Sequence, residues 1–216
     1  MKDEMMNKTI ITAIFFSCVI SLPASASTPD SSTKEAPQTV PVAAQMCVSC
    51  HGAQGQGMDV AGPKLAGLSA AYMVKQIKLF QSGSRQSPLM QPMAMMVQGD
   101  AIQVVADYFA SQPVDHVTLR YRGDKLVMTE PAEKLAYQGD WSRDIPACFS
   151  CHGPSAVGAE LFPRLAGQQA SYIKSQLEAW QKGTRKGDTD NVMGKVASKL
   201  TATEIDALAH YFTSLK

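Results

Sequence analysis

The sequence of 216 residues has little net charge, few aromatic side chains and few cysteines. Its 20 basic and 19 acidic residues leave a formal net charge of +1, which argues against nucleic acid or any strongly charged partner. Phe, Trp and Tyr make up 7% of the chain, which is modest for the cores of small domains. Of the five cysteines, four stand in two copies of one short pattern.

The chain also lacks an apolar run long enough to span a bilayer comfortably. Residues 10–22 are apolar, whereas a membrane span needs about 20 residues. This run follows Lys2 and Lys8 and precedes Ala24-Ser25-Ala26, a small-residue cleavage site. Residues 1–26 are therefore expected to be a secretory signal peptide that sends the mature chain to the periplasm, with an uncleaved anchor as the alternative.

The pattern that contains the four remaining cysteines is Cys-x-x-Cys-His, at residues 47–51 and 148–152. It is the attachment site of a c-type haem, in which each thiol adds across one haem vinyl group. The adjacent histidine then binds the iron from one face, which predicts two covalent haem c groups with iron ligands His51 and His152. The cysteines expected to form the thioethers are Cys47, Cys50, Cys148 and Cys151.

Two other interpretations would use the same residues, namely a zinc site and a pair of redox-active dithiols. Zinc sites rarely place a histidine directly after the second cysteine in both halves, and redox dithiols usually occur in a βαβ pattern that is missing here. The fifth cysteine, Cys18, lies in the apolar run and would leave with the signal peptide. Haem attachment then uses every cysteine of the exported chain, which suits an oxidising compartment.

The two motifs belong to a tandem repeat. Residues 72–85 match residues 172–185 at an offset of 100, and Pro-(Lys/Arg)-Leu-Ala-Gly precedes each stretch. A Tyr-Phe pair near the end of each copy repeats at an offset of 103. A period near 100 is too long for a solenoid and predicts a duplicated globular domain. The expected divisions are a disordered segment at 27–41, domain 1 at 42–112, a connector at 113–129 and domain 2 at 130–216.

Both domains are expected to be all-α, because apolar residues recur at helical spacing in each copy. Gly83 and Gly183 stand where a glycine commonly ends a helix. The pattern Thr201-x-x-Glu204 predicts a capping box at the start of the last helix. The helices expected are 69–82 with its copy in domain 2, 100–111, 202–215, a short helix ending at each haem motif, and one from Pro131 to about Gln138. A hairpin is expected around residues 117–128 of the connector.

The second axial ligand decides whether each iron only carries electrons or is open to substrates. A methionine thioether stabilises ferrous iron and is typical of electron-carrying cytochromes c. Met193 is the only methionine after the second motif and stands 19 residues before Phe212. The same distance before Phe109 selects Met90 from the run Met90, Met93, Met95 and Met96, with Met93 as runner-up. Core filling is the more common role of such a run.

Two further pairs recur at equivalent positions in the repeat. Pro63 and Pro163 follow the motif histidines, and their carbonyls are expected either to accept the second ring N–H of the histidine or to shape a turn. Arg85 and Arg185 are expected to be either solvated surface residues or partners of haem propionates.

Together these features resemble the dihaem cytochromes c of the c4 type, over roughly residues 42–112 and 130–216. The resemblance rests on Cys-x-x-Cys-His-Gly, Pro-(Lys/Arg)-Leu-Ala-Gly, a Tyr-x-x-x-Gln helix and a methionine ahead of the last helix, each present twice. It implies two class I cytochrome c folds with His/Met iron, facing haems, and Met90 and Met193 as ligands. The connector does not match the pattern of that family.

The same resemblance implies a function. It indicates a periplasmic electron carrier without enzymatic activity, passing electrons between a donor such as a cytochrome bc complex and a terminal oxidase or reductase. Its partners would be redox proteins and not nucleic acid, and peripheral membrane association stays open. The alternatives are a haem enzyme, such as a dihaem peroxidase or a sulfur-compound dehydrogenase, and a permanent electron-transfer subunit of a larger complex.

Overall fold

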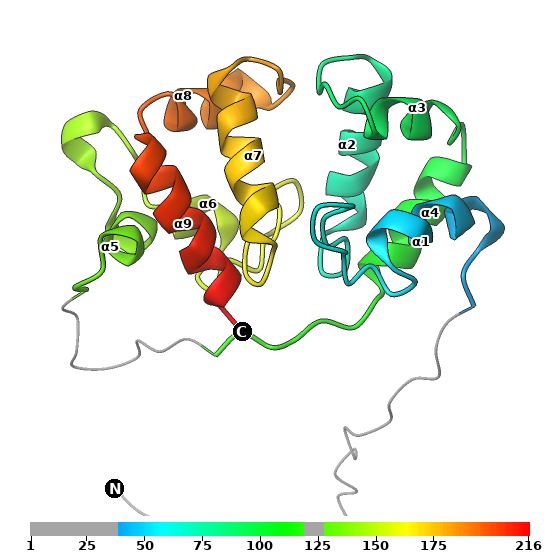
Figure 1. The fold of residues 1–216 in the computed structure, drawn as a ribbon, viewed down its shortest axis with the longest axis horizontal. Helices are drawn as coiled ribbons and strands as arrows, with labels where there is room; N and C mark the ends of the chain where they lie inside the picture. The colour runs from blue at the N-terminus through cyan, green and yellow to red at the C-terminus, as the bar shows by residue number, and fades with distance from the viewer. Residues whose placement is uncertain (1–38, 119–127) are drawn as a thin grey trace, which may run out of the picture. The chain divides into compact units, whose positions relative to one another are not determined.

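The computed structural model describes residues 39–118 and 128–216, and the regular elements within these ranges are all helices (Figure 1). Only isolated β-bridges accompany them there. The expected all-α class is confirmed. The expected signal peptide, most of the segment 27–41 and the hairpin of the connector lie outside the described residues.

Domain 1 consists of one 3-10 helix and four α-helices. These are η1 Val42–Ala44, α1 Gln45–His51, α2 Ala70–Gln81, α3 Met90–Met95 and α4 Ala101–Ala110. Helix α2 packs against both α3 and α4, and η1 packs against α4 (Figure 1). The core between them contains Phe109, which is fully buried, with Tyr72, Met73 and Val105 around it.

Domain 2 repeats this plan with an additional helix ahead of its haem motif. Its elements are α5 Pro131–Gln138, η2 Trp141–Arg143, α6 Cys148–His152, α7 Ala170–Gln181, η3 Thr189–Asn191, α8 Val192–Ala197 and α9 Ala202–Ser214. Helix α7 packs against α8 and α9, and α5 packs against α6 and α9. Phe212 takes the place of Phe109 in the core, together with Ile145, Ile205 and Leu208.

The long helices begin and end where the sequence predicts. Ser69 caps α2 by accepting a hydrogen bond from the Tyr72 N–H at 3.1 Å. Gly83 follows that helix with a φ of 73°, a left-handed conformation that glycine adopts without strain. Thr201 and Glu204 form the predicted capping box of α9. Helices α3 and α8 were not predicted, because each has only six residues and contains a proline or a glycine.

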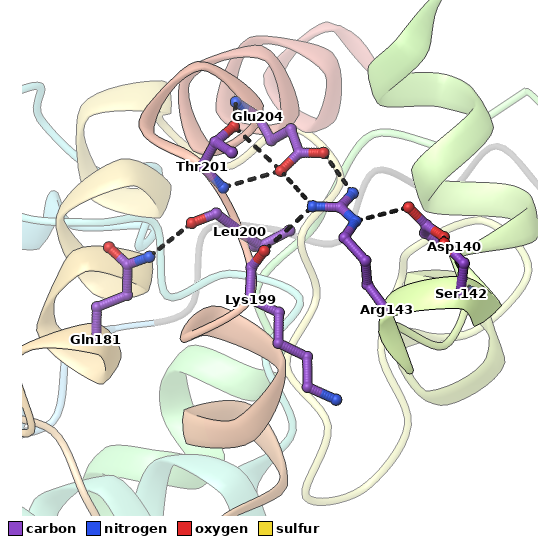
Figure 2. Close-up of polar contacts among 8 residues, drawn as sticks. All are labelled: Asp140, Ser142, Arg143, Gln181, Lys199, Leu200, Thr201 and Glu204. Atoms are coloured by element: carbon purple, nitrogen blue, oxygen red, sulfur yellow. Dashed lines mark hydrogen bonds and ion pairs between the residues drawn. The ribbon is translucent and has the colours of Figure 1, made fainter.

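Arg143 of η2 connects the segment ahead of the second haem motif to α9, the last helix of domain 2 (Figure 2). Its guanidinium donates to Asp140 and Glu204, each at 2.6 Å, and to the Lys199 carbonyl at 3.2 Å. Hydrogen bonds from Ser142 and then from Arg143 lower the pKa of Asp140 to about 2. Glu204 also closes the capping box, so one carboxylate both caps α9 and anchors η2.

Candidate functional site

Each Cys-x-x-Cys-His motif lies at the end of a short helix, α1 in domain 1 and α6 in domain 2. The two cysteines of a motif are three residues apart, so both lie on one face of their helix. None of the four forms a disulfide, and three of them are half-buried while Cys50 is exposed. Gly52 and Gly153 follow the histidines with φ values of 80° and 82°, so the chain turns sharply after each motif.

The two motif histidines are buried and have the same partner in both domains. Nδ1 of His51 donates to the Pro63 carbonyl at 2.8 Å, and Nδ1 of His152 donates to the Pro163 carbonyl at 2.8 Å. The expectation that these proline carbonyls accept the second ring N–H is therefore confirmed. Because a carbonyl can only accept, the proton lies on Nδ1 and Nε2 remains available for a metal.

Burial lowers the pKa of both histidines, and the charge of Arg185 further lowers that of His152. The neutral imidazole that results is the form that binds iron. A side chain at Gly62 would place its Cβ 2.6 Å from the Cys50 carbonyl, so this glycine permits the close approach of the turn before Pro63. The equivalent residue in domain 2 is Phe162, whose ring lies 6.2 Å from that of His152.

Two equivalent glutamines bind the C-terminal ends of α3 and α8, the short helices that contain the candidate methionines. Gln81 Nε2 donates to the carbonyls of Ala94 and Val97, at 2.9 and 2.7 Å. Gln181 Nε2 donates to the carbonyls of Ala197 and Leu200, both at 2.8 Å (the second bond is drawn in Figure 2). The two pairs of carbonyls are therefore related by an offset of 103, which is also the offset between Met90 and Met193.

Exposure separates the four methionines of residues 90–96 into two pairs. The side chains of Met95 and Met96 are 52% and 66% exposed, whereas Met90 and Met93 are half-buried. Met193 is half-buried as well. The Met90 N–H donates to Ser87 Oγ at 3.1 Å, and the Met193 N–H donates to Asp188 Oδ2 at 2.6 Å. In both domains, therefore, a side chain three to five residues upstream accepts a hydrogen bond from the backbone N–H of the candidate methionine.

Arg85 and Arg185 are buried, so the expectation that they are solvated surface residues is wrong. Each guanidinium bonds the tyrosine of the other domain, Arg85 to the Tyr172 hydroxyl at 2.6 Å and Arg185 to the Tyr72 hydroxyl at 2.9 Å. The backbones pair beside them, through Gln86 N–H to the Thr184 carbonyl and Lys186 N–H to the Ser84 carbonyl. This contact between the repeats explains the burial. Pairing with haem propionates stays a prediction.

The arginine cluster has no acidic member within the described residues. Gln76 and Gln176 accept from the guanidinium groups, and the rings of Phe80 and Trp180 lie 4.4 and 4.9 Å from the Cζ atoms of Arg85 and Arg185, respectively. Burial, followed by the charge of Arg85, lowers the pKa of Arg185. Its Nε has no hydrogen-bond partner in the described part of the chain. The cluster therefore favours an anionic group.

Sequence reasoning did not identify Gln168, a buried residue of domain 2 that bonds the backbone of Lys64 in domain 1. Its signal is a difference between the copies, since Leu68 occupies the equivalent position within an otherwise matching stretch. No group of three or more His, Cys, Asp and Glu residues able to hold a metal ion occurs within residues 39–118 and 128–216.

Paired thiols on one helix face, a neutral histidine held by a carbonyl and an all-helical fold, all present twice, define a dihaem c-type cytochrome. The Cytochrome c family model matches residues 41–110 and 132–216. The thiosulfate dehydrogenase electron acceptor of Stutzerimonas stutzeri (strain A1501) is 41% identical over 179 residues, which are 80% of each chain.

Two solved structures are similar in fold and in sequence. Reduced recombinant cytochrome c4 from Pseudomonas stutzeri has a TM-score of 0.70 and 32% identity, covering 80% of this chain and 95% of that one. Thiosulfate dehydrogenase (TsdBA) from Marichromatium purpuratum has a TM-score of 0.70 and 40% identity, covering 79% of this chain. The match spans 36% of the TsdBA chain.

The chain belongs to the cytochrome c family, as a dihaem member of the cytochrome c4 type. It has two covalently bound haem c groups and is an electron-transfer protein, not an enzyme. The described part of the chain contains no helix with the length and hydropathy of a membrane span.

Proposed function

We propose that the chain is a periplasmic electron carrier that accepts electrons from a dehydrogenase acting on a sulfur compound, with thiosulfate as the first candidate substrate of that donor. The observation that supports the electron-carrier role is the duplicated bond of 2.8 Å from a buried histidine Nδ1 to a proline carbonyl. It prepares two equal positions for a low-spin haem, since it fixes the ring plane and the tautomer of each ligand.

In this proposal each haem is bound by four residues. Those of haem 1, in domain 1, are Cys47, Cys50, His51 and Met90; those of haem 2, in domain 2, are Cys148, Cys151, His152 and Met193. The haem supplies a one-electron couple when it is bound, and the protein orients it. With one histidine and one methionine as its protein ligands, each iron would have no ligand position free for a substrate, and each haem would serve electron transfer alone.

The choice of donor rests on similarity. Relatives described as thiosulfate dehydrogenase electron acceptors are 41% and 38% identical to this chain, whereas the cytochromes c4 are 33–35% identical. The second candidate is a carrier between a quinol-oxidising cytochrome bc complex and a terminal oxidase or reductase, which the similarity to cytochrome c4 favours.

Rapid mixing of the oxidised holoprotein with each donor separates these candidates. We expect purified thiosulfate dehydrogenase with thiosulfate to reduce both haems faster than a bc complex with quinol does. The dehydrogenase without thiosulfate serves as the control. Fast reduction by the bc complex alone would reject the sulfur-compound donor and leave the electron-carrier role in place.

A further inference from the structure

The peptide group between Pro63 and Lys64 is hydrogen-bonded at both of its ends. Its carbonyl oxygen accepts from His51 Nδ1 at 2.8 Å, and its N–H donates to Gln168 Oε1 at 3.0 Å. The carbonyl and the N–H of one peptide group are conjugated, so a bond at one end polarises the other. A side chain of domain 2 is thereby connected to the histidine of domain 1 through one peptide group.

Gln168 is rigidly placed for this contact. Its side chain is buried, and its Nε2 donates to the Lys64 carbonyl at 3.0 Å, so the amide bonds both backbone groups of Lys64. Oε1 also accepts from the Gln169 N–H at 3.1 Å. The Gln168 carbonyl accepts from Thr213 Oγ1 of α9 at 2.7 Å. The glutamine is therefore anchored in the core of its own domain while it contacts the other one.

Within the described residues, domain 1 makes no such contact with the peptide group that follows Pro163. The bond from His152 Nδ1 to Pro163 has the same length as its counterpart, 2.8 Å. The next N–H, that of Arg164, donates no hydrogen bond to any residue in the described ranges. Leu68, which has no polar side-chain atom, stands at the position equivalent to Gln168 and lines the same pocket as Arg164. Both histidines thus donate to a proline carbonyl. Only the peptide group of Pro63 also has a hydrogen bond from its N–H end to a side chain of the other domain.

We propose that Gln168 is a positioning residue of domain 2 that lowers the reduction potential of haem 1, a role that rests on His51 being an iron ligand as proposed above. By accepting from the Lys64 N–H, Gln168 makes the Pro63 carbonyl a stronger acceptor for the Nδ1 proton. The imidazole then has more anionic character, which stabilises ferric iron. Because Leu68 cannot act in this way on domain 2, the effect is confined to one haem.

The test replaces Gln168 in the holoprotein by the residue that the repeat already tolerates at this position. In Gln168→Leu we expect the reduced-to-oxidised ratio of haem 1, at fixed ambient potential, to rise on the order of twofold, or ~18 mV at 59 mV per decade. Haem 2 should not change. The two haems are followed separately by the paramagnetically shifted NMR signals of their methyl groups, assigned to each domain through contacts with its residues.

Two variants keep this test decisive. Gln169→Ser, which copies the residue at the equivalent position Ser69, removes the neighbouring bond from Gln169 Nε2 to the Gly62 carbonyl at 3.2 Å. It leaves the Pro63–Lys64 peptide alone, so haem 1 should keep its potential. Gln168→Glu places a carboxylate acceptor at the Lys64 N–H and should shift haem 1 in the direction opposite to Gln168→Leu.

Equal shifts in Gln168→Leu and Gln169→Ser, or equal shifts of both haems, would show that Gln168 merely holds the domains together. An unchanged haem 1 in both Gln168 variants would overturn the proposal. These potentials do not depend on the identity of the electron donor. If His51 is not the ligand, the wild-type protein itself will lack the imidazole signals of a histidine-bound haem 1.

Discussion

The methionines of domain 1 show how one residue can be selected from chemically identical neighbours. Four stand within seven positions, and two of them, Met95 and Met96, are exposed. Between the remaining two, the repeat favours Met90, because the bonds from Gln81 to α3 and from Gln181 to α8 are related by the same offset of 103 as Met90 and Met193. Exposure therefore leaves two candidates, and Met90 as the ligand stays a prediction from the repeat.

Replacing single methionines tests this choice. In ferric Met90→Leu we expect the sulfur-to-iron charge-transfer band to lose about half of its intensity, because one of two haems loses its thioether. Met93→Leu should leave the band intact, and Met193→Leu should remove the other half. If Met93→Leu halves the band while Met90→Leu does not, Met93 is the ligand and the repeat argument is wrong.

Individual residues differ in how far the sequence predicts them. The role of Pro63 was predictable, because its distance from the histidine recurs closely in the other copy and a proline carbonyl is free to accept. The burial of Arg85 and Arg185 was not, because the opposite domain covers them and no local pattern encodes that contact. The contact of Gln168 with Lys64 was not predictable for the same reason, because it also joins the two domains. Its only signal in the sequence is that the equivalent residue of the other copy is Leu68.

At the scale of elements, helix ends were predicted best. The limits of α2 and α9 follow from Ser69, Gly83 and Thr201, which act on the adjacent backbone and need no tertiary contact. Helices α3 and α8 are stabilised instead by packing on α2 and α7 and by the two glutamine side chains, so propensity alone gave no signal for them. The predicted hairpin of the connector stays a prediction.

The capping box of α9 gives a test at this scale. Thr201→Ala removes the bond from the Glu204 N–H to Thr201 Oγ1, which measures 3.2 Å. We expect the free energy of unfolding of the holoprotein to fall by about 1 kcal/mol in chemical denaturation. Ser198→Ala, an exposed site just upstream, should stay within about 0.5 kcal/mol of the wild type. Equal losses in both variants would rule out a specific capping effect.

The Arg143 cluster predicts a dependence of stability on pH. The folded pKa of Asp140 is about 2, below its ordinary value of 3.8, and the pKa of Glu204 is also lowered, chiefly by its hydrogen bond from Arg143. Both groups therefore stabilise the fold above their ordinary pKa values, and this contribution is lost as the pH falls toward 2.

In Arg143→Gln we expect a lower thermal midpoint at neutral pH and a flatter dependence of that midpoint on pH between about 5 and 2. Thermal unfolding of the holoprotein at a series of pH values measures both. Lys182→Gln, which removes an exposed pair with Glu178, is the control and should follow the wild-type curve. A variant curve parallel to the wild-type curve would show that Arg143 does not set these carboxylate pKa values.

At the scale of the whole molecule, the arginine cluster connects the two copies. Arg185→Gln removes the bond of 2.9 Å from Arg185 to the buried Tyr72 hydroxyl. We expect the free energy of unfolding to fall by about 1–3 kcal/mol, an effect partly offset because the substitution also removes the repulsion between Arg185 and Arg85. In calorimetry of the holoprotein we expect one unfolding transition for the wild type and two for Arg185→Gln, because the domains of the variant would no longer unfold together.

Lys186→Gln is the matched control for that measurement. Lys186 is exposed, and its contact across the repeats is made by its backbone N–H, which the substitution keeps. It should unfold like the wild type. Two transitions in Lys186→Gln would show that the effect is not specific to the arginine. A single transition in Arg185→Gln would show that other contacts suffice to join the domains.

The change of offset from 100 to 103 is confined to a few residues. It lies after Arg185 and before Met193, where η3 carries Asp190 and Asn191 with φ values of 54° and 53°. From the Pro-(Lys/Arg)-Leu-Ala-Gly stretch to Arg185 the equivalent pairs keep one register, and from Met193 onward they keep the other. We therefore expect the protein to tolerate exchange of the segments that follow this point in the two copies. Chimeras with exchanged α3 and α8 would separate the effect of the methionine-containing helix on each haem's potential from the effect of its position in the chain.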